Sequence, residues 1–246
     1  MPRLLSMLLL CWACGAQAAL VDRGGGMVHD PERYITWLQD WRMAAGSVYD
    51  DGRSSTDGLM RWESANAWAQ NLVYGGYDDW RLPSTAQPDP SCSNHVAYGW
   101  GGLTQIDFLW GCEAGELGHL FRHQLGGQAH ASVFDATGDT PEQQANLALL
   151  RNLQTYDYWS DILPGSVSEA WSFGMQDGRQ FPAGVWHELH AVAVRSGDVP
   201  EPPMSGLLLL ALAAAALAAQ NRKYFCAIGS TVAGSQVSST PSARTW

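Results

Sequence analysis

The central part of this sequence has little positive charge. Between Asp22 and Glu201 lie all 24 acidic residues but only ten of the 14 basic ones, so this span has a formal charge of −14. A surface of this sign repels phosphate backbones and therefore argues against nucleic acid as a partner. It suits an exported, soluble domain.

Local patterns typical of catalytic sites are also missing. The chain has no diagnostic spacing of Ser, His and Asp or of Cys and His, and no glycine-rich loop that could hold a phosphate. It has no internal repeat either. We therefore expect a binding or structural protein that is not an enzyme and that needs no cofactor.

Long hydrophobic runs occur only near the two ends. Residues 1–19 have the three parts of a secretory signal peptide, with Arg3 in the charged start, an apolar run at 4–13 and small residues at 16–18. The run is too short to cross a bilayer. A buried N-terminal helix is the alternative, and Cys14 lies in a poor sequence context for lipidation.

The C-terminal run has a different character. A Pro-Glu-Pro step, which keeps the backbone extended, precedes a 16-residue apolar stretch at 204–219. This length is slightly under the ~20 residues that span a bilayer comfortably. A basic pair follows and would stay on the cytoplasmic side. The residues of the motif are Pro200, Glu201, Pro202, Arg222 and Lys223.

This pattern resembles the PEP-CTERM sorting signal of Gram-negative bacteria, which is read by an exosortase. The resemblance assigns residues 199–223 to the signal and implies a transmembrane helix that holds the chain transiently in the inner membrane. An ordinary single-span anchor is the alternative. Residues 224–246 depart from the family, whose chains usually stop soon after the basic cluster, and we expect a disordered polar tail there.

The strongest framework signal lies in residues 62–83. One face of a short helix is indicated by apolar residues at i, i+3, i+4 and i+7, namely Ala65, Trp68, Ala69 and Leu72. Gly75 and Gly76 are expected to end this helix, because glycine takes positive φ without a Cβ clash. Trp80 and Leu82 then alternate with polar residues, which predicts a strand with both apolar side chains facing inward.

The same stretch, WESANAWAQNLVYGGYDDWRLPS, resembles the domain named DUF1566, also called the Lcl C-terminal domain. The resemblance continues in YWS at 158–160, AWSF at 170–173 and AVAVR at 191–195, and spans roughly residues 24–197. The matched framework positions are Gly75, Gly76, Asp79, Trp80, Arg81, Leu82, Pro83, Trp159, Trp171 and Arg195.

The resemblance implies an α+β, C-type-lectin-like fold related to sulfatase-modifying factors, with short helices packed on antiparallel strands over residues 20–198. It implies no reaction, because the family has no agreed catalytic residues. From the residues themselves we predict strands at 34–40, 156–159 and 190–195, helices at 115–125 and within 141–153, a hairpin at 177–178 and irregular structure at 88–102.

Cys92 and Cys112 are the only cysteines in the expected exported domain. Two thiols in an oxidising compartment most simply form one disulfide, which would close a loop of about twenty residues. It would pin the irregular stretch onto the helix at 115–125. Two free buried thiols are the alternative, and a copper or formylglycine-type redox site is a third reading.

Glu116, His119 and His123 fall on one side of the expected helix at 115–125. Two histidines at i and i+4 can chelate zinc, but Leu120 stands where a zinc protease has its general base. We therefore predict a solvated polar face. The segment His187-Glu188-Leu189-His190 offers the same residue types with equally little spacing information.

Several acidic residues could supply oxygen ligands for calcium: Asp50, Asp51, Asp57, Asp78 and Asp79. They lack EF-hand spacing and the sugar-binding motifs of C-type lectins. We expect Asp79 instead to cap the turn or to pair with Arg81 or Arg195, and we predict no metal site.

Ten tryptophans lie between Trp37 and Trp186, and most are expected in the core. Trp100 stands among glycines and Trp186 in a loop, so these two could be exposed platforms on which sugar rings stack. Packing in the core is the alternative for each.

Together these observations indicate an exported, exosortase-processed protein at the surface or in the extracellular matrix of a Gram-negative bacterium. Its partners would be signal peptidase, exosortase, transiently the inner membrane, and an extracellular polymer. We expect the domain to bind polysaccharide. A structural matrix component that self-associates is the alternative, and an enzyme of the sulfatase-modifying type is a third reading, which the cysteine count disfavours.

Overall fold

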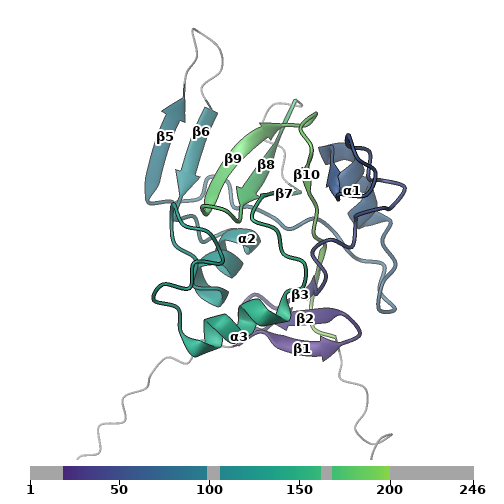
Figure 1. Ribbon diagram of the computed structural model, residues 1–246, viewed down its shortest axis with the longest axis horizontal. Coiled ribbons are helices and arrows are strands. Elements are labelled where there is room, and N and C mark those ends of the chain that lie inside the picture. The colour runs from purple at the N-terminus through teal and green to yellow at the C-terminus, as the bar shows by residue number, and fades with distance from the viewer. Residues whose placement is uncertain (1–18, 99–105, 162–167, 200–246) are drawn as a thin grey trace, which may run out of the picture. The chain divides into compact units, whose positions relative to one another are not determined.

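Short β-branched and aromatic segments, separated by glycine turns, pair into two sheets (Figure 1). The computed structural model describes residues 19–98, 106–161 and 168–199. All of them belong to one unit of the chain, which ends at Val199. Residues 1–18 of the expected signal peptide, the sorting residues from Pro200 onward and Trp100 lie outside the described residues.

The smaller sheet has the strand order β1-β2-β3-β11 and is antiparallel throughout. Its strands are β1 (Val21–Gly24), β2 (Met27–Asp30), β3 (Ile35–Leu38) and β11 (Val194–Ser196). The strand expected at 34–40 is confirmed as β3. The segment of β1 reads VDRG and is followed by two more glycines, so it has no strand-like periodicity in the sequence.

The larger sheet has the order β4-β10-β7-β8-β9-β6-β5, and its neighbours are antiparallel except for β10 and β7. Its strands are β4 (Leu59–Met60), β5 (Asn94–Tyr98), β6 (Ile106–Trp110), β7 (Asp157–Trp159), β8 (Glu169–Gly174), β9 (Arg179–Gly184) and β10 (Leu189–His190). The hairpin predicted at 177–178 joins β8 to β9, with Gly178 at a φ of 69°.

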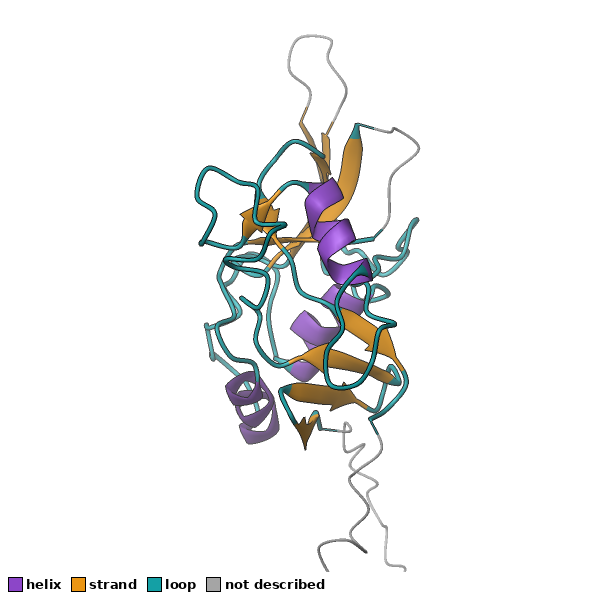
Figure 2. Ribbon diagram, turned by 90° about the vertical axis from the view of Figure 1, so that its right-hand side faces the viewer, coloured by secondary structure: helices purple, strands orange, loops and turns teal. Residues whose placement is uncertain are grey.

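The helices are short, and turns and loops fill much of the chain between them (Figure 2). They are α1 (Trp62–Gln70), α2 (Glu116–His119), the π-helix η1 (Leu120–Gln124) and α3 (Pro141–Leu149). The helices expected at 115–125 and within 141–153 are confirmed. Thr140 and Gln143 start α3 with a reciprocal capping box, which satisfies two backbone donors at the helix end.

Several details of the predicted framework are wrong. The single strand predicted at 190–195 is divided between β10 and β11, with residues 191–193 in neither strand. Helix α1 ends at Gln70, and Gly75 and Gly76 instead form the two-residue turn between the bridged residues Tyr74 and Tyr77. Their φ angles are 63° and 86°, so the need for glycine is real although the turn type differs. The stretch at 88–102 is not irregular throughout, because its residues 94–98 form β5.

Trp80 and Leu82 point inward as expected, with 2% and 0% of their surface exposed. They do not form a regular strand. Between them Arg81 makes a single antiparallel bridge with Val194, in which each backbone N–H donates to the other residue's carbonyl oxygen. Pro83, which has no backbone N–H to donate, comes directly after Leu82. This bridge attaches the segment to the end of β11.

Residues 189–196 connect the two sheets. Figure 1 shows this stretch running from β10 in the larger sheet towards the smaller one, where β11 pairs with β3. Ala191, Val192, Ala193 and Val194 are all at most 1% exposed. Because the connection itself is buried, one hydrophobic core serves both sheets.

The core is rich in aromatic rings, as the sequence predicts. The indoles of Trp37 and Trp41 stack with centroids 5.7 Å apart, and Trp41 meets Tyr158 edge-on at 5.0 Å. Trp159 is fully buried and its Nε1–H donates to the carbonyl oxygen of Met60 at 2.8 Å. The matched position Trp171 is only partly buried on β8.

Arg195 locks the glycine turn to the smaller sheet. Its guanidinium donates to both carboxylate oxygens of Asp79 at 2.7 and 3.0 Å and lies 3.8 Å from the centroid of the Tyr77 ring. The hydrogen bonds from Arg195 lower the pKa of Asp79. Of the two partners expected for Asp79, the structure therefore has Arg195, while Arg81 pairs with Glu116.

Candidate functional site

Among the tryptophans that the structure describes, Trp186 is the one at the surface, with 62% of its area exposed. It stands in the turn between β9 and β10. A Cβ atom added at Gly184 would lie 2.5 Å from the Trp186 indole, so the ring packs against bare backbone. The ring of His187 lies nearby, with centroids 5.8 Å apart and planes inclined by 31°. The exposed indole of Trp186 thus lies against the backbone of its own turn.

Backbone hydrogen bonds fix this turn on both sides. The N–H of Val185 donates to the carbonyl oxygen of Ser168 at 3.0 Å, and the carbonyl oxygen of Val185 accepts from the N–H of Trp62 at 3.2 Å. The N–H of His187 donates to Gly184 at 2.9 Å. The turn therefore has little freedom to lose when a ligand binds, which favours affinity.

An acidic loop at 50–58 lies beside the turn. Glu188 accepts the N–H of Arg53 at 3.1 Å, and His190 Nδ1 lies 3.3 Å from the carbonyl oxygen of Gly58. The structure therefore separates the residues of the expected His187–His190 group: His187 is exposed, whereas His190 is buried. Burial is the main cause that lowers the pKa of His190.

The carboxylates of this loop hold its backbone. Asp50 accepts the N–H groups of Gly46 and Gly58 at 2.9 and 3.0 Å, and Asp51 accepts that of Arg61 at 3.1 Å. Asp57 accepts from Leu59 two residues on, at 3.0 Å. These contacts are turn caps of the kind that Asp side chains make.

The polar residues of the helix at 116–124 do not form the solvated face that the sequence predicts. Glu116 turns towards Arg81, with contacts of 2.8 and 2.7 Å, and only 11% of its side chain is exposed. His119 Nε2 lies 3.1 Å from a carboxylate oxygen of Glu32, and its side chain is 12% exposed. The prediction is wrong because the segments containing Glu32 and Arg81 cover this face.

His123 is more open, with 37% of its side chain exposed, and its Nε2 lies 3.0 Å from Glu113. The imidazoles of His119 and His123 stack with centroids 4.8 Å apart. Burial, and next the charge of Arg33, lower the pKa of His119 to about 4, so this imidazole is neutral at pH 7. Sequence reasoning did not identify Glu32 and Glu113, because Glu32 is remote from the histidines along the chain and Glu113 precedes the helix that contains them.

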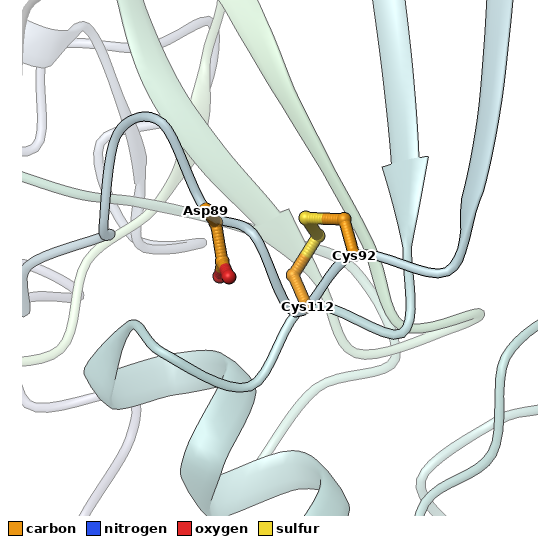
Figure 3. Close-up of side chains that lie close together, drawn as sticks. All are labelled: Asp89, Cys92 and Cys112. Atoms are coloured by element: carbon orange, nitrogen blue, oxygen red, sulfur yellow. A yellow bond between two sulfur atoms is a disulfide. The ribbon is translucent and has the colours of Figure 1, made fainter.

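The predicted disulfide between Cys92 and Cys112 is confirmed. It lies at the open end of the β5–β6 hairpin, where the N–H of Ser93 donates to Trp110. Asp89 lies beside it (Figure 3) and accepts the N–H groups of Ser91 and Ala114 at 2.9 and 3.2 Å. Ala114 precedes α2 by two residues, so these bonds tie the hairpin base to the helix, as expected.

Asp89, Cys92 and Cys112 also offer three ligand atoms within 4.8 Å of one another, the set that the described part of the chain brings closest to a metal-binding arrangement. With both sulfurs in the disulfide, no thiolate is present to bind an ion. The same bond leaves no free thiol at these positions for a formylglycine-type reaction.

No protein-family model, curated protein or solved structure matches this chain. Within residues 19–98, 106–161 and 168–199, no helix has both the length and the apolar character needed to cross a bilayer. The apolar stretch at 204–219 lies outside these ranges.

Proposed function

We propose that this protein is exported and that its folded domain binds an extracellular polysaccharide at Trp186. The observation that carries the proposal is the exposed indole, which is held in place by Gly184 and by the bonded turn around it. An exposed aromatic face held by a rigid support offers a large apolar surface at low entropic cost. The C–H faces of sugar rings have the shape and polarity to stack on such a surface.

Polar groups around the indole would supply orientation. His187 is exposed, Glu188 is partly exposed, and Glu169 lies directly across from Gly184 in the β8–β9 pair. Ring hydroxyls can donate to carboxylates and accept from backbone or imidazole N–H groups. A stacking face flanked by such groups would both hold and orient a sugar ring.

Features of the whole chain support the export part of the proposal. The disulfide between Cys92 and Cys112 is typical of an oxidising compartment. We propose that residues 1–19 direct secretion and that the signal at 199–223 is processed by an exosortase. We propose that the domain between them is a C-type-lectin-like member of the DUF1566 group. The α+β composition and the mostly antiparallel sheets of this chain agree with that proposal.

Binding to insoluble and soluble polysaccharides by the full-length protein tests the proposal. Trp186→Ala removes the platform, and Phe134→Ala is the matched control because Phe134 is also an exposed aromatic, with 52% of its surface open. We expect Trp186→Ala to weaken binding at least tenfold, about 1.4 kcal/mol, and Phe134→Ala to leave it unchanged.

Two outcomes would count against this function. Equal binding by the two variants would remove Trp186 from the site. Absence of binding to any neutral or acidic polymer, together with concentration-dependent assembly in light scattering, would favour a structural matrix component instead.

A further inference from the structure

We propose that Trp171 is a second stacking platform beside Trp186, and that the ligand is an uncharged linear chain of sugars that reaches both indoles along strands β8 and β9. This inference rests on the proposed function, because it names the class of polysaccharide that the Trp186 site takes. Its starting point is the register of the β8–β9 pair. In this pair Gly184 lies opposite Glu169, and Trp171 is two residues further along β8.

The two indoles belong to the same face of the strand pair. Side chains two residues apart in a strand point to one face, and residues directly opposite each other in neighbouring strands share a face. The side-chain positions of Glu169, Trp171 and Gly184 therefore fall on one face. The indole of Trp186 covers Gly184 on this face, because a Cβ atom built at Gly184 would lie 2.5 Å from the ring.

Burial decreases along this face in the direction of Trp186. Phe173 is fully buried, and its ring meets that of Phe121 with centroids 5.5 Å apart. Trp171, two residues earlier on β8, is partly exposed and is not among the side chains that pack against the hydrophobic core of the described residues. Glu169 is partly exposed as well. The core therefore covers one end of the face, and the two tryptophans lie at the other end.

The separation of the two platforms indicates a ligand of linked sugars. Gly184 and Trp171 are diagonal neighbours in the strand pair, and such positions are about 7–8 Å apart. This span is longer than one pyranose ring, so a single sugar stacked on Trp186 would leave Trp171 uncovered. A β-1,4-linked chain is extended and presents C–H faces along its length, which suits two aromatic rings on one face of a strand pair.

The carboxylate of Glu169 favours an uncharged chain. Glu169 lies directly across from Gly184 and two residues from Trp171, so it borders the path between the two indoles. Its oxygens can accept hydrogen bonds from sugar hydroxyls, whereas they would repel the carboxylate of a uronic acid. The net negative charge of the whole chain acts in the same direction at longer range.

Calorimetric titration of the full-length protein with β-1,4-linked oligosaccharides of glucose and of N-acetylglucosamine tests the ligand length. We expect the hexasaccharide to bind at least tenfold more tightly than the disaccharide in one of the two series. Trp171→Ala should abolish this gain without changing the affinity for the disaccharide, and Trp171→Phe should keep part of the gain. Phe181→Leu is the matched control and should keep all of it, because Phe181 is a partly buried aromatic on the opposite face of the same strands.

Oligogalacturonate of the same length tests the role of charge. We expect it to bind at least tenfold more weakly than the neutral hexasaccharide, because its carboxylates face that of Glu169. Glu169→Gln should narrow this difference and leave the gain with chain length in place. An unchanged difference in Glu169→Gln would remove Glu169 from the path of the ligand.

The outcomes separate this inference from the function on which it rests. Three results would overturn the inference and leave the proposed function standing, provided that Trp186→Ala weakens binding: no gain from disaccharide to hexasaccharide, a full gain in Trp171→Ala, or oligogalacturonate bound as tightly as the neutral chain. Equal binding by Trp186→Ala and the wild type, or no binding of any of these glycans, would instead overturn the proposed function and the inference with it.

Discussion

Two turns in this molecule each combine a glycine with a nearby tryptophan, but one tryptophan is buried and the other is exposed. In the turn at 74–77, a Cβ on Gly75 would lie 2.6 Å from the Met27 side chain, and the nearby Trp80 is buried with its Nε1–H donated to Tyr74. In the turn at 184–187, the ring packed on Gly184 belongs to Trp186 and stays exposed. Burial of the aromatic ring makes the first turn structural, and exposure makes the second available to a ligand.

The largest contrast is expected from truncating the two tryptophans. Trp80→Ala removes a ring that is 2% exposed and should lower the free energy of unfolding by about 3–5 kcal/mol. Trp186→Ala should change it by less than about 0.5 kcal/mol, because little of its contact area is lost. Chemical denaturation of both variants measures the difference, and similar losses would contradict the division into structural and binding turns.

Removing the disulfide is a second way to distinguish an effect on folding from an effect on binding. Replacing Cys92 and Cys112 by Ser should cost about 3 kcal/mol on the chain-entropy model, since the bond closes a loop with a sequence separation of 20. Polysaccharide binding by the fraction that remains folded should be unaffected, because the disulfide lies at the β5–β6 hairpin. Denaturation with and without reductant, followed by a binding assay, checks both parts.

Arg195→Met removes the ion pair that holds the turn at 74–77 against the smaller sheet. We expect a loss of about 1–2 kcal/mol, a modest value because half of the Asp79 side chain is exposed. The effect depends on pH in a defined direction. Arg195 lowers the pKa of Asp79, so its contribution is complete above the ordinary value of 3.8 and is lost as pH falls through the lower folded-state value.

Thermal melts of the wild type and Arg195→Met at pH 7 and at progressively lower pH test this linkage. The gap in melting temperature should narrow below about pH 4. A gap that widens as the pH falls would show that the Asp79 carboxylate is not what Arg195 stabilises.

Gly184→Ala sharpens the comparison with a small effect on stability. The added methyl group would meet the indole, and moving an exposed ring should cost under about 1 kcal/mol. The displaced indole should nevertheless weaken polysaccharide binding nearly as much as Trp186→Ala. Gly75→Ala is the counterpart: its positive φ and the buried Met27 side chain predict a loss of stability with no specific loss of binding.

Local patterns predicted the parts of the fold that depend on neighbours in sequence. The apolar spacing of Ala65, Trp68 and Ala69 gave one buried face of α1, and the two isolated cysteines predicted their disulfide. The turn at Gly75 was assigned to the wrong role, because its φ of 63° requires a glycine in either kind of turn. A helix end and a hairpin turn both accept glycine with positive φ.

Long-range pairing explains what the sequence could not show at the sites. The sequence left two possibilities for Trp186, an exposed side chain or a core side chain. The choice between them depends on how the turn around Gly184 and Val185 packs on distant segments, which the sequence does not show. The contacts of His119 and His123 with Glu32 and Glu113 join separate loops, so a helical-face pattern predicted solvation instead. Periodicity reports which residues share a face, but it does not report what covers that face.

Hydrogen–deuterium exchange of the full-length protein with and without polysaccharide tests the central proposal most directly. We expect added protection in residues 184–188 and in the loop at 50–58, which Glu188 contacts, with little change around Gly75. Protection confined to the Gly75 turn or to the β5–β6 hairpin, or none at all with a polymer that demonstrably binds, would contradict the assignment of Trp186 as the binding platform.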